Sequence, residues 1–347
     1  MRTSRREILK FAGMAGVAGV FPGLARANAL ETKEVRIAVG GKALTYYLPL
    51  SVAELLGYFK DEGLDVSIAD FAGGSRALQA VVGGSADVVS GAFEHTINLQ
   101  AKKQAFRAFV LQGRAPMIGM GVSTKNMPDY KSPADLKGKK IGVTAPGSST
   151  NMLVSFFLAQ HGLKLSDVSI IGVGGGAGAV TAIRSGQIDA ISNVDPVLSM
   201  LENSGDIKTI VDTRSLKDTL EVFGGSMPAG CLYARDEFVQ ENPNTCQALT
   251  NAIVRADKWI QKNGPAEVAK LVPENYLLGD PDVYIRAVTQ SMDGLSPDGM
   301  IPEDGPATAL KALAAYVKDF PPADQIDLSK VWTNDFAKRA NEKYPNG

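Results

Sequence analysis

Hydroxyl-bearing and aromatic residues gather where loops of this sequence lead into helical segments. Thr45-Tyr46-Tyr47 precedes one such segment, and Ser148-Ser149-Thr150 precedes another. Serine or threonine at these positions can cap a helix, and the free backbone N–H groups beside it attract an anion. A tyrosine pair can supply an apolar wall together with a hydroxyl donor. These residues predict contacts to a small molecule, with helix capping and core packing as the alternatives.

Other loops add further candidate ligand contacts. Arg76 could neutralise an anion or face solvent, and Glu94 could bind a ligand or only stabilise the first turn of its helix. His95 could donate to a bound oxyanion or act as a cap. Together with the two loops above, the candidates for ligand binding are Gly74, Ser75, Arg76, Phe93, Glu94, His95, Asn193, Asp195 and Ser226.

Catalytic and metal-binding constellations are not evident in the sequence. The 347 residues include two cysteines, Cys231 and Cys246, and two histidines, His95 and His161. This is too few for a His-rich metal site, and no Cys/His pair has a plausible spacing for a nucleophile. We therefore expect no enzyme activity, no metal and no cofactor. We expect both thiols to be free and buried, with a disulfide as the alternative.

Two further functions are disfavoured by composition and context. The net charge of −1 shows no basic excess, so nothing suggests nucleic acid. The glycine-rich run Gly172 to Ala177 looks superficially like a dinucleotide fingerprint. It follows the second strand of its unit instead of the first, and it has a counterpart at Gly73-Gly74, so we do not expect NAD.

The elements that must position these loops form an internal repeat. Ile37-Ala38-Val39 and Ile141-Gly142-Val143 open two segments with the predicted order strand, helix, strand, helix, strand. The third strands begin with similar sequences, Gly84 to Ser90 and Gly186 to Ser192. A shift of about 100 residues is too long for a solenoid repeat and predicts two similar βαβαβ lobes. Their facing carboxyl edges would form a cleft for a small molecule.

Several motifs also resemble a known family. Leu48 to Val66, the Gly84-to-Asp87 turn, Asp135 to Val143, and Gly147-Ser148 are similar in order and spacing to the nitrate/sulfonate/taurine solute-binding proteins. The resemblance covers residues from about 34 to 270. In that family the Gly-Ser loop touches the ligand, which favours the same role for this loop here.

The resemblance implies an α/β protein with the type II periplasmic-binding fold. Each lobe would be a βαβαβ-type sheet flanked by helices, followed by a C-terminal helical region. The chain would cross between lobes twice, near Val122 to Thr124 and near Met227 to Tyr233. The expected divisions are 28–124 for the first part of lobe 1, 125–226 for lobe 2, and 227–347 for the return crossing and helices that pack mostly on lobe 1.

The function that the resemblance implies is capture of a solute for an ABC importer. Its partners would be the permease and ATPase of the inner membrane, and we expect a monomer. Helix N-termini, hydroxyls and Arg76 favour a small anionic organic solute such as a sulfonate, nitrate or a taurine-like compound. Tyr46, Tyr47, Phe93 and Glu94 leave an aromatic or pyrimidine-type solute open. The alternatives are a sensor and a same-fold thiamine pyrimidine precursor synthase, for which His95 is the one candidate reactive histidine.

Residues 1–27 predict export. Ser4 to Lys10 resembles the twin-arginine motif, with Ile8 where phenylalanine is commoner. A mildly apolar stretch, Phe11 to Leu24, leads to the cleavage site Ala25-Arg26-Ala27. We expect a mature chain that begins near Asn28 in the periplasm, with an uncleaved N-terminal anchor as the alternative.

Overall fold

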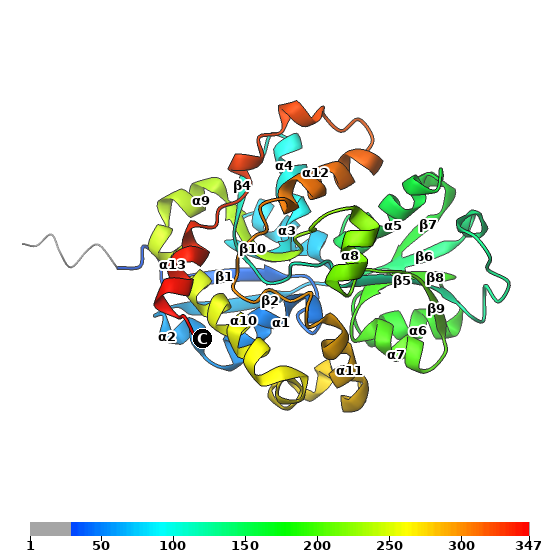
Figure 1. The fold of residues 1–347 in the computed structure, drawn as a ribbon, viewed down its shortest axis with the longest axis horizontal. Helices are drawn as coiled ribbons and strands as arrows, with labels where there is room; N and C mark the ends of the chain where they lie inside the picture. Colours follow the sequence, from blue (N-terminus) through cyan, green and yellow to red (C-terminus); the bar gives the residue numbers. More distant parts are fainter. Residues whose placement is uncertain (1–28, 347) are drawn as a thin grey trace, which may run out of the picture.

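The computed structural model describes residues 29–346, which form two lobes, each built on a five-stranded sheet (Figure 1). The predicted export signal lies outside the described residues. The first sheet has the order β2-β1-β3-β10-β4 and the second β7-β6-β8-β5-β9. The first is made of β1 (Glu34–Val39), β2 (Asp65–Asp70), β3 (Val88–Ala92), β4 (Phe106–Leu111) and β10 (Gly230–Arg235). The second is made of β5 (Ile118–Ser123), β6 (Lys140–Val143), β7 (Ser169–Gly172), β8 (Ala190–Val194) and β9 (Ile207–Asp212).

The predicted repeat is the common core of both sheets. In the first lobe β1 pairs in parallel with β2 and β3, and in the second β6 pairs in parallel with β7 and β8. Each core is completed by one antiparallel strand from a different part of the chain. β10 lies between β3 and β4, and β5 lies between β8 and β9. The α/β class and the two-sheet architecture are therefore as predicted.

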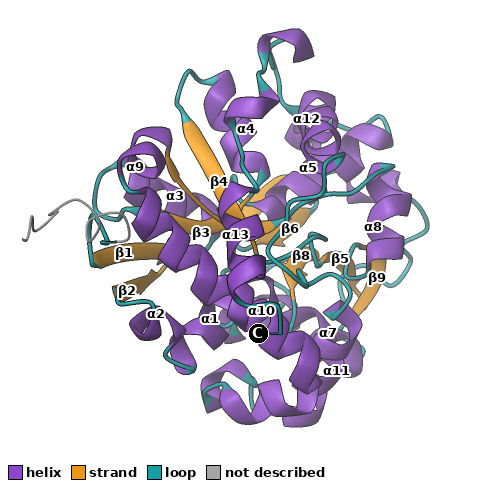
Figure 2. Ribbon diagram, turned by 60° about the vertical axis from the view of Figure 1, so that its left-hand side comes forward, coloured by secondary structure: helices purple, strands orange, loops and turns teal. Residues whose placement is uncertain are grey.

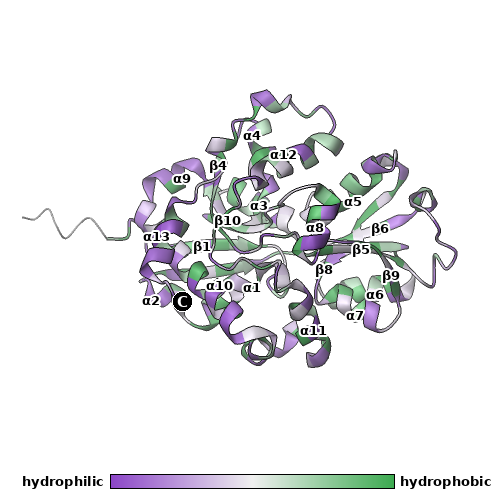
Figure 3. Ribbon diagram, in the orientation of Figure 1, coloured by the Kyte–Doolittle hydropathy of each residue, from purple (hydrophilic) through white to green (hydrophobic). Residues whose placement is uncertain are grey.

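Helices cover the outer sides of both sheets, as Figure 2 shows. In the first lobe these are α1 (Leu48–Leu55), α2 (Tyr58–Asp61), α3 (Gly74–Val82), α4 (Glu94–Ala101) and α9 (Asp236–Glu241). In the second they are α5 (Ser149–Gln160), α6 (Ala177–Ser185), α7 (Val197–Asn203) and α8 (Leu216–Phe223). Gly57, whose φ is 76°, separates α1 from α2. Central strands such as β5 are largely apolar, whereas the outward helix α13 is largely polar (Figure 3).

The first crossing between the lobes is not where the sequence suggested. We expected it near Val122 to Thr124, but β5 already belongs to the second sheet, so the crossing is residues 112–117. The predicted boundary at 124 was therefore wrong, because β5 forms long-range antiparallel pairs that leave no local signal. The second crossing is residues 224–229, since β10 has joined the first sheet by Gly230. The crossings run side by side, with the Ala229 N–H donating to the Gly113 carbonyl at 2.9 Å.

The C-terminal helices bridge the two lobes. They are α10 (Pro243–Leu271), which is kinked at Gly264, α11 (Pro281–Ser291), α12 (Gly305–Tyr316) and α13 (Asp335–Lys343). The long α10 packs on α1 and α13 in the first lobe, as expected. The other two reach the second lobe as well: α11 packs on α7, and α12 packs on both α4 and α5. They lie on opposite sides of the passage between the lobes (Figure 1).

The two cysteines are buried and free, as predicted. Cys231 lies in β10 and Cys246 in α10, and both belong to the large apolar core that extends through both lobes. Over residues 29–346, no helix combines the length and the apolar character that a membrane crossing requires.

Candidate functional site

A small cavity lies between the carboxyl edges of the two sheets. Its volume is about 20 Å³, which is room for a water molecule. Both lobes contribute to its lining: Gly40, Leu44, Tyr46, Tyr47 and Gly74 come from the first lobe, and Ile118, Thr144, Ser148, Ser149, Thr150 and Val194 come from the second. A larger solute therefore needs the lobes to separate for entry, and the lining side chains to rearrange as the lobes close again.

Direct hydrogen bonds join the loops of the two lobes beside this cavity. The Ser75 N–H donates to the Ser148 hydroxyl oxygen at 3.1 Å, and the Ser75 hydroxyl donates to the Pro146 carbonyl at 2.9 Å. On another side the Thr45 N–H donates to the Asp195 carbonyl at 3.0 Å. Neither lobe encloses the cavity alone, because these contacts and the lining come from both.

A glycine allows the loops to approach so closely. A Cβ atom on Gly73 would lie 2.7 Å from the Cβ of Ala145 in the other lobe. The backbone φ of Gly73 is −177°, which any residue can adopt, so the constraint is the opposing lobe and not the conformation. The absence of a side chain at Gly73 is therefore what lets the two lobes meet.

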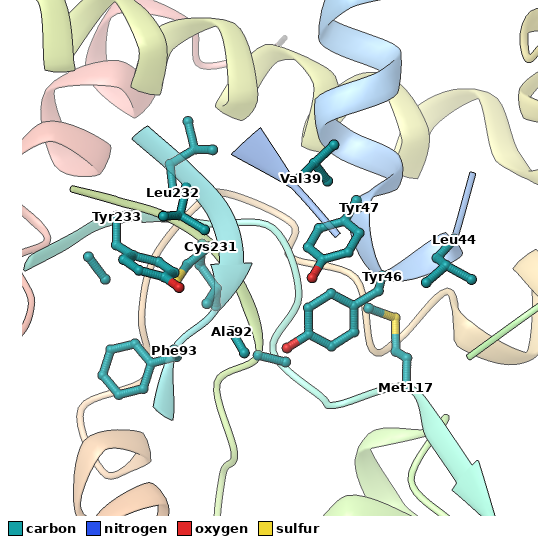
Figure 4. Packing of buried hydrophobic residues seen from close by; sticks show 14 of the residues in the cluster. Val39, Leu44, Tyr46, Tyr47, Ala92, Phe93, Met117, Cys231, Leu232 and Tyr233 are labelled. Atoms are coloured by element: carbon teal, nitrogen blue, oxygen red, sulfur yellow. The ribbon is translucent and has the colours of Figure 1, made fainter. Parts of the chain in front are cut away.

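Tyrosines form the wall on the first-lobe side (Figure 4). Tyr46 and Tyr47 lie in a short 3₁₀ helix, Thr45–Tyr47, with their rings edge-on and 4.8 Å apart between centroids. Their hydroxyls point toward the same space as that of Tyr233 on β10 (Figure 4). The Tyr233 hydroxyl is 3.0 Å from Nδ1 of His95. Burial lowers the pKa of His95, which favours the neutral imidazole.

Glu94 brings a negative charge to this wall. It opens α4 directly after β3, it is 3% exposed, and one of its carboxylate oxygens has no hydrogen-bond partner within residues 29–346. Burial raises the pKa of Tyr46 and Tyr47, and the charge of Glu94 raises both further. Both tyrosines are therefore neutral hydrogen-bonding groups at ordinary pH.

On the second-lobe side, the start of α5 faces the cavity. Ser148 is its N-cap residue, and the Thr150 hydroxyl is held by the Thr144 hydroxyl at 2.9 Å. The Gly147 N–H donates to the Asn151 side-chain oxygen at 2.9 Å. Because α5 is twelve residues long, its N-terminal end contributes a partial positive charge opposite the tyrosines.

The predicted contact residues divide into three groups. Those that line the cavity are Tyr46, Tyr47, Gly74, Ser148, Ser149 and Thr150. Those beside it, at the loop contacts or behind the tyrosines, are Thr45, Ser75, Phe93, Glu94 and His95. Those that are not gathered at the cavity lining are Arg76, Asn193, Asp195 and Ser226.

The residues of the third group have other surroundings. Arg76 is exposed. The Asn193 side chain donates to the Gly174 carbonyl at 3.0 Å, and the Ser226 N–H donates to the Asp304 carboxylate at 3.1 Å. The Asp195 carboxylate accepts from the Ser199 N–H and lies 3.7 Å from Arg214. Burial raises the pKa of Asp195, and Arg214 opposes that rise.

Some lining residues were missed by sequence reasoning. Gly40 and Thr144 directly follow equivalent strands, β1 and β6, so the internal repeat could have identified them as a pair. Leu44, Val194 and Ile118 are apolar and carry no signal that separates a cavity wall from core. Ile118 was also hidden by the wrong position of the first crossing.

Comparisons with known proteins agree with this architecture. The model of the NMT1-like family matches residues 28–272, so the chain belongs to that family. YtlA of Bacillus subtilis, which is named as a binding protein, is 24% identical over 261 residues, 74% of this chain and 76% of YtlA. The 4-amino-5-hydroxymethyl-2-methylpyrimidine phosphate synthase of Candida albicans is 27% identical over 246 residues, 67% of this chain and 68% of the synthase.

Solved structures share the fold. A protein from Bordetella bronchiseptica RB50 is 76% identical and has a TM-score of 0.91, covering 92% of this chain and all of that one. The alkanesulfonate-binding protein SsuA of Xanthomonas axonopodis, bound to MOPS, has 20% identity and a TM-score of 0.67, covering 88% of this chain and all of SsuA. The periplasmic nitrate-binding protein NrtA of Synechocystis PCC 6803 has 17% identity and a TM-score of 0.72, covering 91% and 90%. The chain thus has the fold of the periplasmic solute-binding proteins.

Proposed function

We propose that this protein is the extracytoplasmic solute-binding component of an ABC importer. One observation carries the proposal: the cavity is lined by loops of both lobes, which touch through direct hydrogen bonds. Such a site loads by separation of the lobes and holds its solute by closure. Open and closed forms present different surfaces, so a permease can recognise the loaded form. The predicted signal in residues 1–27 supports delivery to the periplasm.

The predicted anionic solute has support from one side of the cavity only. The N-terminal end of α5, with its serine hydroxyls, suits an oxyanion such as a sulfonate. Arg76, the predicted countercharge, is exposed. The charged group behind the tyrosine wall is Glu94, which would repel an anion. An anionic group could therefore be bound only at the α5 end of the cavity.

Native mass spectrometry of the gently purified protein tests capture directly. We expect a bound small molecule, released intact when the protein is denatured. Small-angle scattering should then show a more compact protein with that molecule than without it. A protein that carries nothing and keeps one shape with every solute tested would contradict the proposal.

An enzyme of the same fold is the second candidate, favoured by the likeness to the pyrimidine phosphate synthase. In that case His95, buried and beside Tyr233, would be the reactive residue. Incubation of the released molecule with fresh protein separates the two functions. A binding protein returns the molecule unchanged, whereas an enzyme converts it, and a His95→Gln variant would abolish that conversion.

A further inference from the structure

Two buried polar groups at the tyrosine wall form no hydrogen bond of regular geometry within residues 29–346. These are the Tyr46 hydroxyl, which has the Ser149 side chain of the other lobe near it, and one carboxylate oxygen of Glu94; both residues are 3% exposed. A buried polar group without a hydrogen bond destabilises a protein, and it does so more strongly if it is charged. Tyr46 lines the cavity itself, so its hydroxyl is available to a molecule held there.

The charge of Glu94 is also uncompensated. None of the ion pairs formed by the described residues includes Glu94, and no cationic side chain is among the cavity-lining residues. The groups that feel its charge are neutral: four tyrosines, Cys231 and a histidine whose pKa is lowered by burial. A buried carboxylate in such surroundings is stabilised by a cation or by strong hydrogen-bond donors.

We propose that the solute carries a cationic nitrogen, an ammonium or amidinium group, that lies against the tyrosine wall when the lobes close and is attracted there by the charge of Glu94 beside that wall. The proposal rests on the solute-capture function proposed above and assigns the chemistry of its ligand. Glu94 is not itself among the lining residues, so the Tyr46 hydroxyl would make the direct contact, by donating to an acceptor atom of the solute. The faces of Tyr46 and Tyr47 add a favourable environment for a cation. A purely anionic solute would leave Glu94 unpaired and bring a second negative charge beside it.

The first test needs no ligand. Replacing Glu94 by glutamine removes the uncompensated charge and keeps the shape of the side chain. The melting temperature of solute-free protein should therefore rise by roughly 2–4 °C. Glu62 is the matched control, because its buried carboxylate is fully paired, with Asn251 at 2.7 Å and Lys343 at 2.9 Å. Glu62→Gln should lower the melting temperature. A lower melting temperature for Glu94→Gln would show that the folded protein already compensates this charge, and would overturn the proposal.

The second test identifies the nitrogen. We expect the molecule released from the wild-type protein to contain a nitrogen that is protonated at neutral pH. Glu94→Gln should bind it at least tenfold more weakly by isothermal titration calorimetry, while Glu62→Gln binds it as the wild type does. A released solute without such a nitrogen would overturn this proposal and leave solute capture intact. Failure of capture itself would appear as a wild-type protein with no bound molecule and no change of shape. If no molecule is recovered, the melting-temperature comparison decides the charge proposal alone.

Discussion

Adding one methyl group at Gly73 should prevent the lobes from closing fully. The new Cβ of Gly73→Ala would lie 2.7 Å from the Cβ of Ala145, whereas carbon atoms prefer a separation of about 3.5–4.0 Å. The loops must then move apart by about 1 Å. That displacement breaks the two hydrogen bonds of Ser75, at 3.1 and 2.9 Å, to the second lobe. At about 0.5–1.5 kcal/mol each, their loss weakens solute binding by about 1–3 kcal/mol, or roughly 5- to 150-fold.

The assay compares Gly73→Ala with a matched glycine. Gly73 is the N-cap residue of α3, and Gly176 holds the same place at α6, also with extended backbone. A Cβ on Gly176 would meet nothing within 4 Å. Calorimetric titration with the solute released from the wild-type protein should show weaker binding for Gly73→Ala alone. Both variants should keep the wild-type melting temperature in the absence of solute. Wild-type affinity in Gly73→Ala would refute the reasoning, since these loops could not then touch in the loaded form.

Three other predictions concern stability and closure. Ser148→Ala should weaken solute binding by up to about tenfold, with little change in melting temperature, because its hydroxyl accepts from Ser75 of the other lobe. Arg214→Met should lower the free energy of unfolding in urea by about 3–5 kcal/mol, because this buried guanidinium pairs with three carboxylates; an unchanged value would mean that the cluster is not stabilising. Burial raises the pKa of Asp257 well above its ordinary value, so the folded state binds a proton that the unfolded state releases above about pH 4. Asp257→Asn should therefore stabilise the protein most at pH 8 and progressively less toward pH 4, and an advantage that grows as the pH falls would contradict this.

Local signals were enough to predict the repeated part of the fold. Glycines and short apolar runs identified the parallel strands β1 to β3 and β6 to β8, and the loops after them. Tyr46, Tyr47 and the Ser148-to-Thr150 loop follow the first strand of each lobe and do line the cavity. In each case the deciding information lies within a few residues, because capping, turn formation and strand periodicity are short-range effects.

Contacts between distant parts of the chain decided the rest. β5 and β10 each complete a sheet by pairing antiparallel with strands that are distant in the sequence. No local pattern predicts this pairing, so the first crossing was misplaced. Asp195 has the right residue type and strand end for a ligand contact. Its carboxylate nevertheless lies near Arg214, nineteen residues away, and receives the Ser199 N–H. Contacts between distant parts of the chain also explain why Arg76 and Glu94 have different surroundings. The sequence offered both as charged residues at helix starts. Only the packing of the lobes exposed Arg76 and buried Glu94, with one of its carboxylate oxygens unpaired among residues 29–346.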